Sequence, residues 1–498
     1  MSILQKIPPE LLEAVCHRLD APSIVRFTQV SRQLWHIFLQ SSALQYKVQL
    51  ELAGFCDGQL TTGSAARLDM LKAHQAAWAS FDCTCSAKTT VKMDGEYWEL
   101  VGNVLATYKP ERGFFFQRIP SALRQVPPAE WCITTDLPAR IEDFSLDLSQ
   151  DLLLVVEATS SRSPVVHLLS LKTGRPHPLA RNAHLSKDVD AQGSSPCFNF
   201  QIRIFGEYIG LMADLDDDAG GAELLVWQWK TGVLKQMDLC GDEMTSFAFL
   251  TESRLLLCAV VDSQPELRVL NIEGPTEYFY FRLPALSPNA ARIAVEMMIH
   301  TEPPPSWPAE TQLDEPFTIC HSDRLFVVSL RGFGWGTSFE PTFMLCVRLS
   351  TLLGLMENPS EDRTIAWDRW GPSNTCMLRV PRLTDTWVCF VYGQRCVIQT
   401  TNTRCQIIDF NPFTARKRTL TVDKRRRMFG HPVTTSAPFA VHSMEISPSA
   451  AVMLAEDGVV TVSVRPRLPF VETTLTGDVM HAAGRRLVHN FFSVIRCF

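Results

Sequence analysis

The hydrophobic pattern of this chain changes once along its length, near residue 90. Before that point, apolar residues recur every three or four positions, which is typical of amphipathic helices. Beyond it, short apolar runs alternate with clusters of Pro, Gly, Ser and Asp, which predict strands joined by tight turns. The sequence therefore predicts an α+β multidomain protein, with a small all-α part at the N-terminus and a large all-β part behind it.

Three short helices are expected at the start of the chain. Pro8 and Pro9 preset the backbone for a helix start. Asp20 and Pro22 end that helix and open the next, and Ser31 can cap a third. Helices this short cannot bury all of their apolar residues among themselves, because domains of about forty residues usually need a partner. The remaining apolar face is a candidate docking surface, and an ordinary helical hairpin is the alternative.

The segment from Ile7 to Phe38 resembles an F-box in its Pro-Pro-Glu-Leu start and in the Val-Ser-Arg-Gln-Leu-Trp run of its third helix. It departs from the family pattern at Ile7, where leucine is usual, at Ser31, where cysteine is common, and at Trp35, which is one place late. These exchanges keep volume and polarity. The resemblance implies docking to a Skp-type adaptor and, through it, to a cullin. The residues it implies for adaptor contact are Pro8, Pro9, Leu11, Leu12, Val15, Leu19, Ile24 and Leu34.

Two further helices are expected before the β part. Ser41 and Ser42 can cap one that Gly54 closes, and another should run from about Ser64 to Ser80. A rigid helical linker would hold a bound cargo at a fixed distance from the adaptor. The expected domains are therefore an F-box at 1–45, a helical linker at 46–90 and a β domain at 91–498.

The β part repeats a unit of strand, tight turn, strand, turn and strand, with clear copies beginning at Glu142, Thr245 and Val441. The third strand of each unit carries an apolar-polar-apolar signature, which Lys-Thr-Gly follows at 172–174 and 230–232. A further unit is expected from Tyr97 to Ile119. The signatures occur at 169–171, 227–229, 270–272, 347–349, 408–410 and 462–464.

Repeats at this spacing predict a β-propeller of about seven blades. A pair of β-sandwiches is the alternative, but it would not need so many units. The pattern is similar to the degenerate WD-like propellers that follow F-boxes in many fungal proteins, although Trp367-Asp368 is the only Trp-Asp dipeptide. The last residues, including Phe491, Phe492 and Ile495, are expected to close the ring against the first blade.

Composition narrows the class of partner. The 498 residues carry 47 Lys and Arg against 53 Asp and Glu, a net charge of -6, which provides no general attraction for nucleic acid or anionic lipid. No apolar run reaches membrane-spanning length and no secretory pattern opens the chain. The 15 cysteines are odd in number and mostly isolated, as expected for reduced thiols. We therefore expect a soluble protein of the cytoplasm, the nucleus or both.

Several stretches imitate chemical sites. Asp214, Asp216 and Asp218 alternate like a calcium loop, but the required glycine and glutamate are missing, which favours an acidic hairpin loop. The glycines at 332, 334 and 336 lack the lysine and helix of a phosphate loop, which favours a flexible inter-strand loop. Cys83 and Cys85 lack the further ligands that zinc needs. No cofactor or metal is expected.

Two surface segments remain candidates for contact. The basic residues at 416–418 and 424–427 fit a nuclear import signal or a patch for anionic cargo, and a solvated loop is the alternative. The proline-rich, acidic segment at 302–316 reads as an exposed insertion suited to partner contact.

Catalytic motifs are absent from the sequence. The pattern favours a non-catalytic substrate receptor of a Skp/cullin/F-box ubiquitin ligase, whose protein substrate the sequence does not identify. The alternatives are an F-box and propeller scaffold with no role in ubiquitination, and a propeller enzyme that no residue signals.

Overall fold

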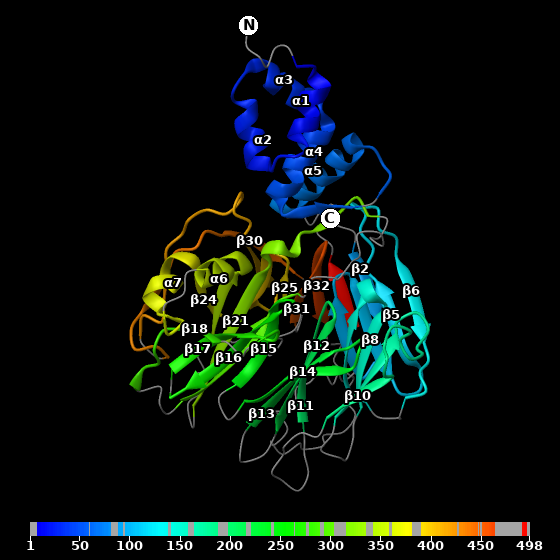
Figure 1. Cartoon of the computed structure of the whole chain (residues 1–498), viewed down its shortest axis with the longest axis vertical. Helices are drawn as coiled ribbons and strands as arrows, with labels where there is room; N and C mark the ends of the chain where they lie inside the picture. Colours follow the sequence, from blue (N-terminus) through cyan, green and yellow to red (C-terminus); the bar gives the residue numbers. More distant parts are fainter. Residues whose placement is uncertain are drawn as a thin grey trace.

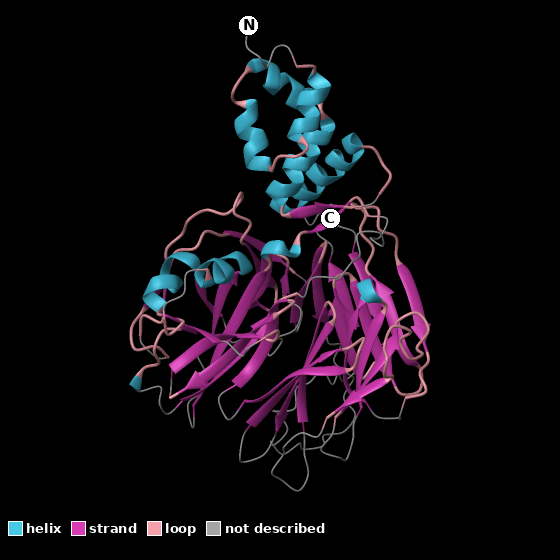
Figure 2. Ribbon diagram, viewed as in Figure 1, coloured by secondary structure: helices cyan, strands magenta, loops and turns pink. Residues whose placement is uncertain are grey.

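The structure is a computed structural model. It describes residues 7–58, 60–80, 88–92, 95–137, 141–157, 164–187, 198–215, 221–240, 244–262, 264–274, 278–288, 293–302, 315–334, 342–357, 361–380, 390–425, 428–446, 448, 451–463 and 491–495. A helical unit stands on one end of a ring of β-sheets (Figures 1 and 2).

The helical unit consists of α1 (Pro9–Cys16), α2 (Ala21–Thr28), α3 (Arg32–Gln40), α4 (Ser42–Ala53) and α5 (Ser64–Ser80). Its predicted ends are confirmed. The side chains of Asp20, Ser31 and Ser41 accept hydrogen bonds from backbone N–H groups in the first turns of α2, α3 and α4. Gly54 ends α4 in the left-handed conformation, at φ 73°.

The first four blades follow one another along the chain. Blade 1 contains β3 (Tyr97–Val101), β4 (Val104–Lys109), β5 (Gly113–Arg118) and β6 (Ala129–Ile133). Blade 2 contains β7 (Ile141–Asp147), β8 (Leu152–Glu157), β9 (Val165–Ser170) and β10 (His184–Ser186), with a 3-10 turn at Leu148–Gln150. Blade 3 contains β11 (Phe198–Phe205), β12 (Tyr208–Leu215), β13 (Gly221–Gln228) and β14 (Val233–Cys240). Blade 4 contains β15 (Met244–Thr251), β16 (Arg254–Val261), β17 (Gln264–Asn271) and β18 (Tyr278–Arg282), with β23 (Thr364–Ile365) added at its edge.

The remaining blades carry insertions. Blade 5 contains β19 (Ile293–His300), β21 (Leu325–Gly334), β22 (Thr342–Arg348) and β24 (Cys376–Val380), and α6 (Leu349–Met356) and α7 (Trp367–Asn374) follow β22. Blade 6 contains β25 (Val391–Tyr392), β26 (Arg395–Thr401), β27 (Arg404–Asp409) and β30 (Ala440–Glu445), with the hairpin β28 (Leu420–Val422) and β29 (Val433–Thr435) inserted before β30. Blade 7 contains β31 (Ala451–Ala455), β32 (Gly458–Ser463), β33 (Phe491–Ile495) and β2 (Lys88–Lys92).

These six four-stranded sheets and one five-stranded sheet make seven blades, which confirms the predicted propeller. Neighbouring blades touch along their first strands, for example β3 with β7 and β11 with β15. The ring closes in blade 7, where β33 pairs with β2 from the start of the β part. The first residues and the last residues of the ring therefore share one sheet, and the β domain begins at Lys88, slightly before the expected residue 91.

The repeated signature has a structural reason. In six blades, the residue directly after the third strand donates its backbone N–H to the carbonyl of the residue directly before the second strand. This bond ties the end of the third strand to the first hairpin. The donor and acceptor pairs are Ile119 and Asn103, Leu171 and Asp151, Trp229 and Glu207, Ile272 and Ser253, Leu349 and Arg324, and Phe410 and Gln394.

The unit expected from Val441 to Val464 is wrong. β30 is the fourth strand of blade 6 and pairs with β27, whereas β31 and β32 are the first two strands of blade 7. Val462 and Ser463 of the triplet at 462–464 are therefore the last residues of a second strand, and residue 464 lies outside the described residues. An alternating pattern shows that a segment is a strand, but it does not show which sheet the strand joins.

Several further predictions are either wrong or fall outside the described residues. Gly332 and Gly334 lie inside β21, so the loop expected there is wrong, and Gly336 lies outside the described residues. Residues 303–314 of the expected insertion are also outside them, but its end is not exposed: Glu315 is buried, and β20 (Phe317–Ile319) follows it. The aspartate run at 214–218 and Cys83 with Cys85 fall outside the residues whose side chains are described.

Candidate partner-binding surface

Exposed apolar side chains gather on the helical unit. Among the described residues, ten large hydrophobic side chains are exposed, and six of them lie between residues 11 and 39. We call these six residues the apolar surface. They are Leu11, Val15, Val25, Val30, Trp35 and Leu39.

The spacing of these residues explains why they share faces. Leu11 and Val15 are four positions apart on α1, so they form one stripe, whereas the next stripe of the same helix, Leu12 and Cys16, is buried. Trp35 and Leu39 form the equivalent stripe on α3, which contacts α1. Each helix therefore has one apolar face for its own core and a second one in water.

The eight residues predicted for adaptor contact do not share one environment. Pro8, Pro9, Leu11 and Val15 are exposed, and Leu19 is half-buried against the helical core. Leu12, Ile24 and Leu34 are at most 3% exposed. The prediction of direct contact is corrected for these last three, because their side chains already fill the interior of the unit.

Trp35 and Leu39 are exposed residues that were not among those predicted for adaptor contact. Their spacing of four on an otherwise polar face of α3 was the available signal. Trp35 also stacks on Phe38, with ring centroids 5.9 Å apart and an interplanar angle of 28°. Its indole is thus held in place while 47% of the residue remains exposed.

The core of the unit depends on α4. Leu44 and Val48 of α4 complete an apolar cluster with Cys16, Ala21 and Ile24. The expected domain boundary at residue 45 therefore falls inside a helix that both neighbouring parts need.

Polar side chains of α4 also bond to the ends of the three smaller helices. Glu51 accepts from the N–H of Ala21 at the start of α2, at 2.8 Å. Lys47 donates to the carbonyl of His17 at the end of α1, at 2.6 Å, and Gln45 donates to the carbonyl of Leu39 at 2.9 Å. A carboxylate at a helix start and an ammonium at a helix end both suit the helix dipole.

The opposite face of α4 packs on the propeller. Tyr46 and Leu50 join an apolar cluster that also contains Leu71 and Trp78 of α5 and many side chains of blades 5, 6 and 7. The Tyr46 hydroxyl donates to the carbonyl of Pro316 at 2.6 Å. One helix thus belongs to two cores, which fixes the helical unit on the ring.

A short sheet adds a second connection. β1 (Phe55–Asp57), directly after α4, pairs antiparallel with β20 of the blade 5 insertion. We call this two-stranded sheet the joint. Separately, Asn411 of blade 6 donates to the carbonyl of Leu52 near the end of α4, at 2.9 Å.

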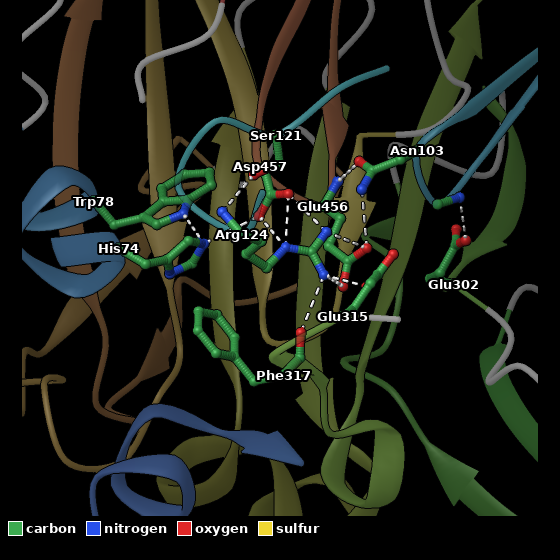
Figure 3. Close-up of polar contacts among 11 residues, drawn as sticks. His74, Trp78, Asn103, Ser121, Arg124, Glu302, Glu315, Phe317, Glu456 and Asp457 are labelled. Carbon is green, nitrogen blue, oxygen red and sulfur yellow. Dashed lines mark hydrogen bonds and ion pairs between the residues drawn. The ribbon is translucent and has the colours of Figure 1, made fainter. Parts of the chain in front are cut away.

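A buried group of charges lies beneath α5 (Figure 3). Its members, which we call the anchor cluster, are His74, Arg124, Glu315, Glu456 and Asp457. They come from α5, the loop after β5, the segment before β20 and the turn between β31 and β32. The cluster therefore ties the helical unit to blades 1, 5 and 7.

Arg124 is the centre of this cluster and is fully buried. Its Nη1 lies 2.6 Å from Glu315 Oε2, and its Nη2 lies 2.8 Å from Glu456 Oε2 and 2.6 Å from Asp457 Oδ2. His74 Nε2 lies 3.1 Å from Asp457 Oδ1. The Asn103 amide donates to Glu456 at 3.0 Å, which links the first hairpins of blades 1 and 7.

Three carboxylates around one guanidinium cannot all ionise without cost in a buried site. Burial raises the pKa of Glu456 to about 8, against the opposing effect of Arg124, and it also raises the pKa of Glu315. Burial acts in the same sense on Asp457, but Arg124 and His74 hold the pKa of that carboxyl below its usual range. Burial lowers the pKa of His74. The cluster is thus suited to structural support rather than to contact with a ligand.

The predicted basic segment lies on the surface. Arg416, Lys417 and Arg418 are exposed, and Lys417 lines a groove of about 730 Å³ together with Trp367 and Asp368 of α7. Arg426 and Arg427 lie outside the described residues. The roles of this basic segment in nuclear import or in binding anionic cargo stay predictions.

Within the part of the chain that the structure describes, no group of three or more His, Cys, Asp or Glu side chains could hold a metal ion. No helix of that part is long and apolar enough to cross a membrane.

Comparison with known proteins adds only distant likenesses. No family model and no curated protein matches the chain. An uncharacterized protein from Listeria monocytogenes EGD-e is 10% identical, with a TM-score of 0.35 over 75% of this chain and 91% of that one. Drosophila Plexin A in complex with Semaphorin 1b is 11% identical, with a TM-score of 0.33 over 82% and 84% of the two chains. Drosophila Semaphorin 1b, extracellular domains 1-2, is 10% identical, with a TM-score of 0.32 over 83% and 85%. Scores this low carry no argument about what the chain does.

Proposed function

We propose that this chain is the non-catalytic substrate receptor of a Skp/cullin/F-box ubiquitin ligase. The apolar surface docks on a Skp-type adaptor, and the propeller binds a protein cargo. The observation that carries the proposal is that Leu11, Val15, Trp35 and Leu39 remain exposed on a unit whose own core is already complete.

The chemistry of the apolar surface favours a protein partner. Clustered exposed apolar side chains on a soluble protein usually mark an interaction site, and tryptophan is enriched among the residues that dominate binding energy. Helices α1 to α3 stand clear of the ring, so a partner can reach them without touching the propeller (Figure 1). The resemblance of residues 7–38 to an F-box names the kind of partner.

The mechanism is positional. A receptor of this kind breaks no bond itself but raises the local concentration of its cargo near a ubiquitin-charged enzyme. That task requires a fixed geometry between adaptor and cargo. The shared core around α4, the joint and the anchor cluster supply three separate connections between the docking unit and the ring.

Leu11→Asp and Val15→Asp test the proposal directly. Both side chains are exposed, so the chain should fold, while a carboxylate in the apolar interface should weaken binding to a purified Skp-type adaptor by at least about thirtyfold. Ala73→Asp is the matched control, because it places the same charge on an exposed position of α5. Calorimetric titration of full-length variants gives the affinities. Equal affinity of Leu11→Asp and Ala73→Asp would count against the proposal.

Ligase receptor and plain scaffold differ in one readout. Deletion of residues 1–45 would remove the first residues of α4, which both parts of the chain need. Leu11→Asp in the full-length chain is therefore the better variant for separating the two functions. In cells, this variant should lengthen the half-life of a cargo captured by the propeller if the chain is a receptor. An unchanged half-life with adaptor binding lost would favour the scaffold.

The proposed compartment is the cytoplasm, the nucleus or both. The nine described cysteines are all free thiols, and five of them are buried in strands of the ring. Free thiols at this number fit a reducing compartment, where ubiquitin ligases of this class work.

A further inference from the structure

The joint places two cysteines side by side. Phe55 pairs with Ile319, so Cys320, which directly follows β20, lies opposite Gly54 and donates its N–H to the Gly54 carbonyl at 2.9 Å. Side chains two positions apart on a strand point to the same face. Cys56 and Cys320 are therefore diagonal neighbours on one face of the joint.

The Cys320 sulfur is surrounded by donors. The Cys56 thiol hydrogen-bonds to it, and so does the backbone N–H of Ser322. The Ser322 hydroxyl oxygen lies 3.0 Å from the same sulfur. These bonds, that of Cys56 above all, lower the pKa of Cys320 to about 5, although burial acts in the opposite sense. Cys320 thus has a lowered thiol pKa and a second thiol, that of Cys56, as a hydrogen-bond partner.

The carboxylates near the Cys56 and Cys320 thiols are paired with cations. The carboxylates whose charges act on the two thiols, raising their pKa values, are Asp57 at Cys56 and Asp323 at Cys320. Each already has a cation: Arg67 Nη1 lies 2.5 Å from Asp57, and Arg348 Nη1 lies 2.9 Å from Asp323. The local negative charge is therefore largely balanced.

Solvent reaches this pair, unlike the buried thiols of blade 5. Cys56 is exposed and Cys320 is half-buried. In contrast, Cys346 and Cys376 are buried within blade 5. A hydrogen bond with the Cys396 thiol, and then burial, raise the pKa of Cys346, and burial raises that of Cys376. A low-pKa, accessible thiol beside a resolving thiol is the arrangement found in redox-sensing proteins.

We infer that Cys56 and Cys320 are a reversible oxidation site that reacts with hydroperoxides and locks the joint. The Cys320 thiolate attacks the terminal oxygen of hydrogen peroxide; the O–O bond breaks, and the departing hydroxide takes up a proton to become water. The Cys56 thiol then attacks the sulfenic sulfur; the S–S bond forms, the S–O bond breaks, and the leaving hydroxide takes the Cys56 proton to become a second water. Exchange with a small-molecule thiol reduces the disulfide and restores both cysteines. The effect on cargo presentation rests on the proposed function, but the oxidation itself does not.

The disulfide would connect the docking unit covalently to blade 5. Residue 56 follows the helix that carries the core of the helical unit, and residue 320 belongs to the insertion between β19 and β21. A bond between them removes the opening of β1 from β20 as a possible motion. Oxidising conditions would then hold the adaptor and the cargo at one distance.

Peptide mapping of the full-length chain tests this inference. Purified protein is treated with a small molar excess of hydrogen peroxide, blocked with iodoacetamide and digested without reductant. We expect a linked peptide containing Cys56 and Cys320, lost in Cys56→Ser and in Cys320→Ser and kept in Cys132→Ser, which removes an exposed thiol of blade 1. Oxidation should raise Tm by at least about 2 °C, and dithiothreitol should reverse the shift.

Two results would overturn the inference. One is accumulation of sulfinic acid at Cys320 without a linked peptide, which means that Cys56 cannot resolve the sulfenic acid. The other is a Cys56–Cys320 link found only between two molecules, as dimers on a non-reducing gel show. Neither result touches adaptor binding, and loss of adaptor binding in Leu11→Asp says nothing about the two thiols.

Discussion

Arg124 lies 333 positions from Asp457 and 191 from Glu315, yet its guanidinium bonds to both. Breaking a buried charge pair is costly because the remaining charges lose their partner while staying out of water. Here three carboxylates depend on one cation. This residue therefore contributes to the seam between blades 1 and 7 and to the attachment of α5.

Replacement of Arg124 should be among the most damaging single changes in the described chain. Arg124→Met keeps much of the volume but leaves the carboxylates unpaired, so we expect a loss of about 3–5 kcal/mol in the free energy of unfolding. Arg404→Met is the matched control, because the Arg404–Glu445 pair is exposed. The free energy of unfolding of this variant should fall by no more than about 0.5 kcal/mol. Urea denaturation measures both. Similar losses in the two variants would show that the anchor cluster has little structural weight.

The raised pKa of Glu456 predicts a pH dependence of stability. A carboxyl whose pKa is about 8 when folded and 4.5 when unfolded binds more protons in the folded state between those values, so its contribution to stability falls as pH rises through that window. Glu456→Gln removes the titration and adds an offset that does not vary with pH. The Tm of the variant relative to the natural chain should therefore be higher at pH 8 than at pH 6, by the equivalent of roughly 1–2 kcal/mol. Thermal melts at the two pH values decide this, and a constant difference would contradict the assignment.

Elements were predictable where their signals are local. The caps at Asp20, Ser31 and Ser41 and the stop at Gly54 each act within a few residues, and each is found where the sequence indicates it. The third strands of blades 2 to 6 were equally predictable from the sequence, because the same apolar-polar-apolar triplet spans the end of each. The last residue of that triplet makes the same backbone hydrogen bond to the first hairpin in every one of these blades.

Elements were not predictable where distant segments decide. The division of the apolar residues of α1 into a buried and an exposed stripe depends on α4, whose Leu44 and Val48 lie beyond the F-box pattern. The anchor cluster gathers residues from four separate segments and leaves no spacing to find. The joint needs β20, a three-residue strand that follows the proline-rich, acidic segment at 302–316 directly and for which the sequence predicted no strand.

At the scale of the whole molecule, the chain consists of a ring that has buried its own sheet faces and the helical unit, which is fixed on one end of it (Figure 2). Apolar clusters run between neighbouring blades, and one of them continues into α4 and α5. Because the two parts share a core, adaptor docking and cargo binding are expected to occur on a single rigid body.

Hydrogen exchange of the full-length chain, with and without a purified Skp-type adaptor, tests this account most directly. The adaptor should slow exchange in α1 and α3, where Leu11, Val15, Trp35 and Leu39 lie, and leave the strands of blades 1 to 7 unchanged. Unchanged exchange in α1 and α3, or protection that falls on the propeller instead, would contradict the claim that the exposed stripes of the helical unit are the docking site.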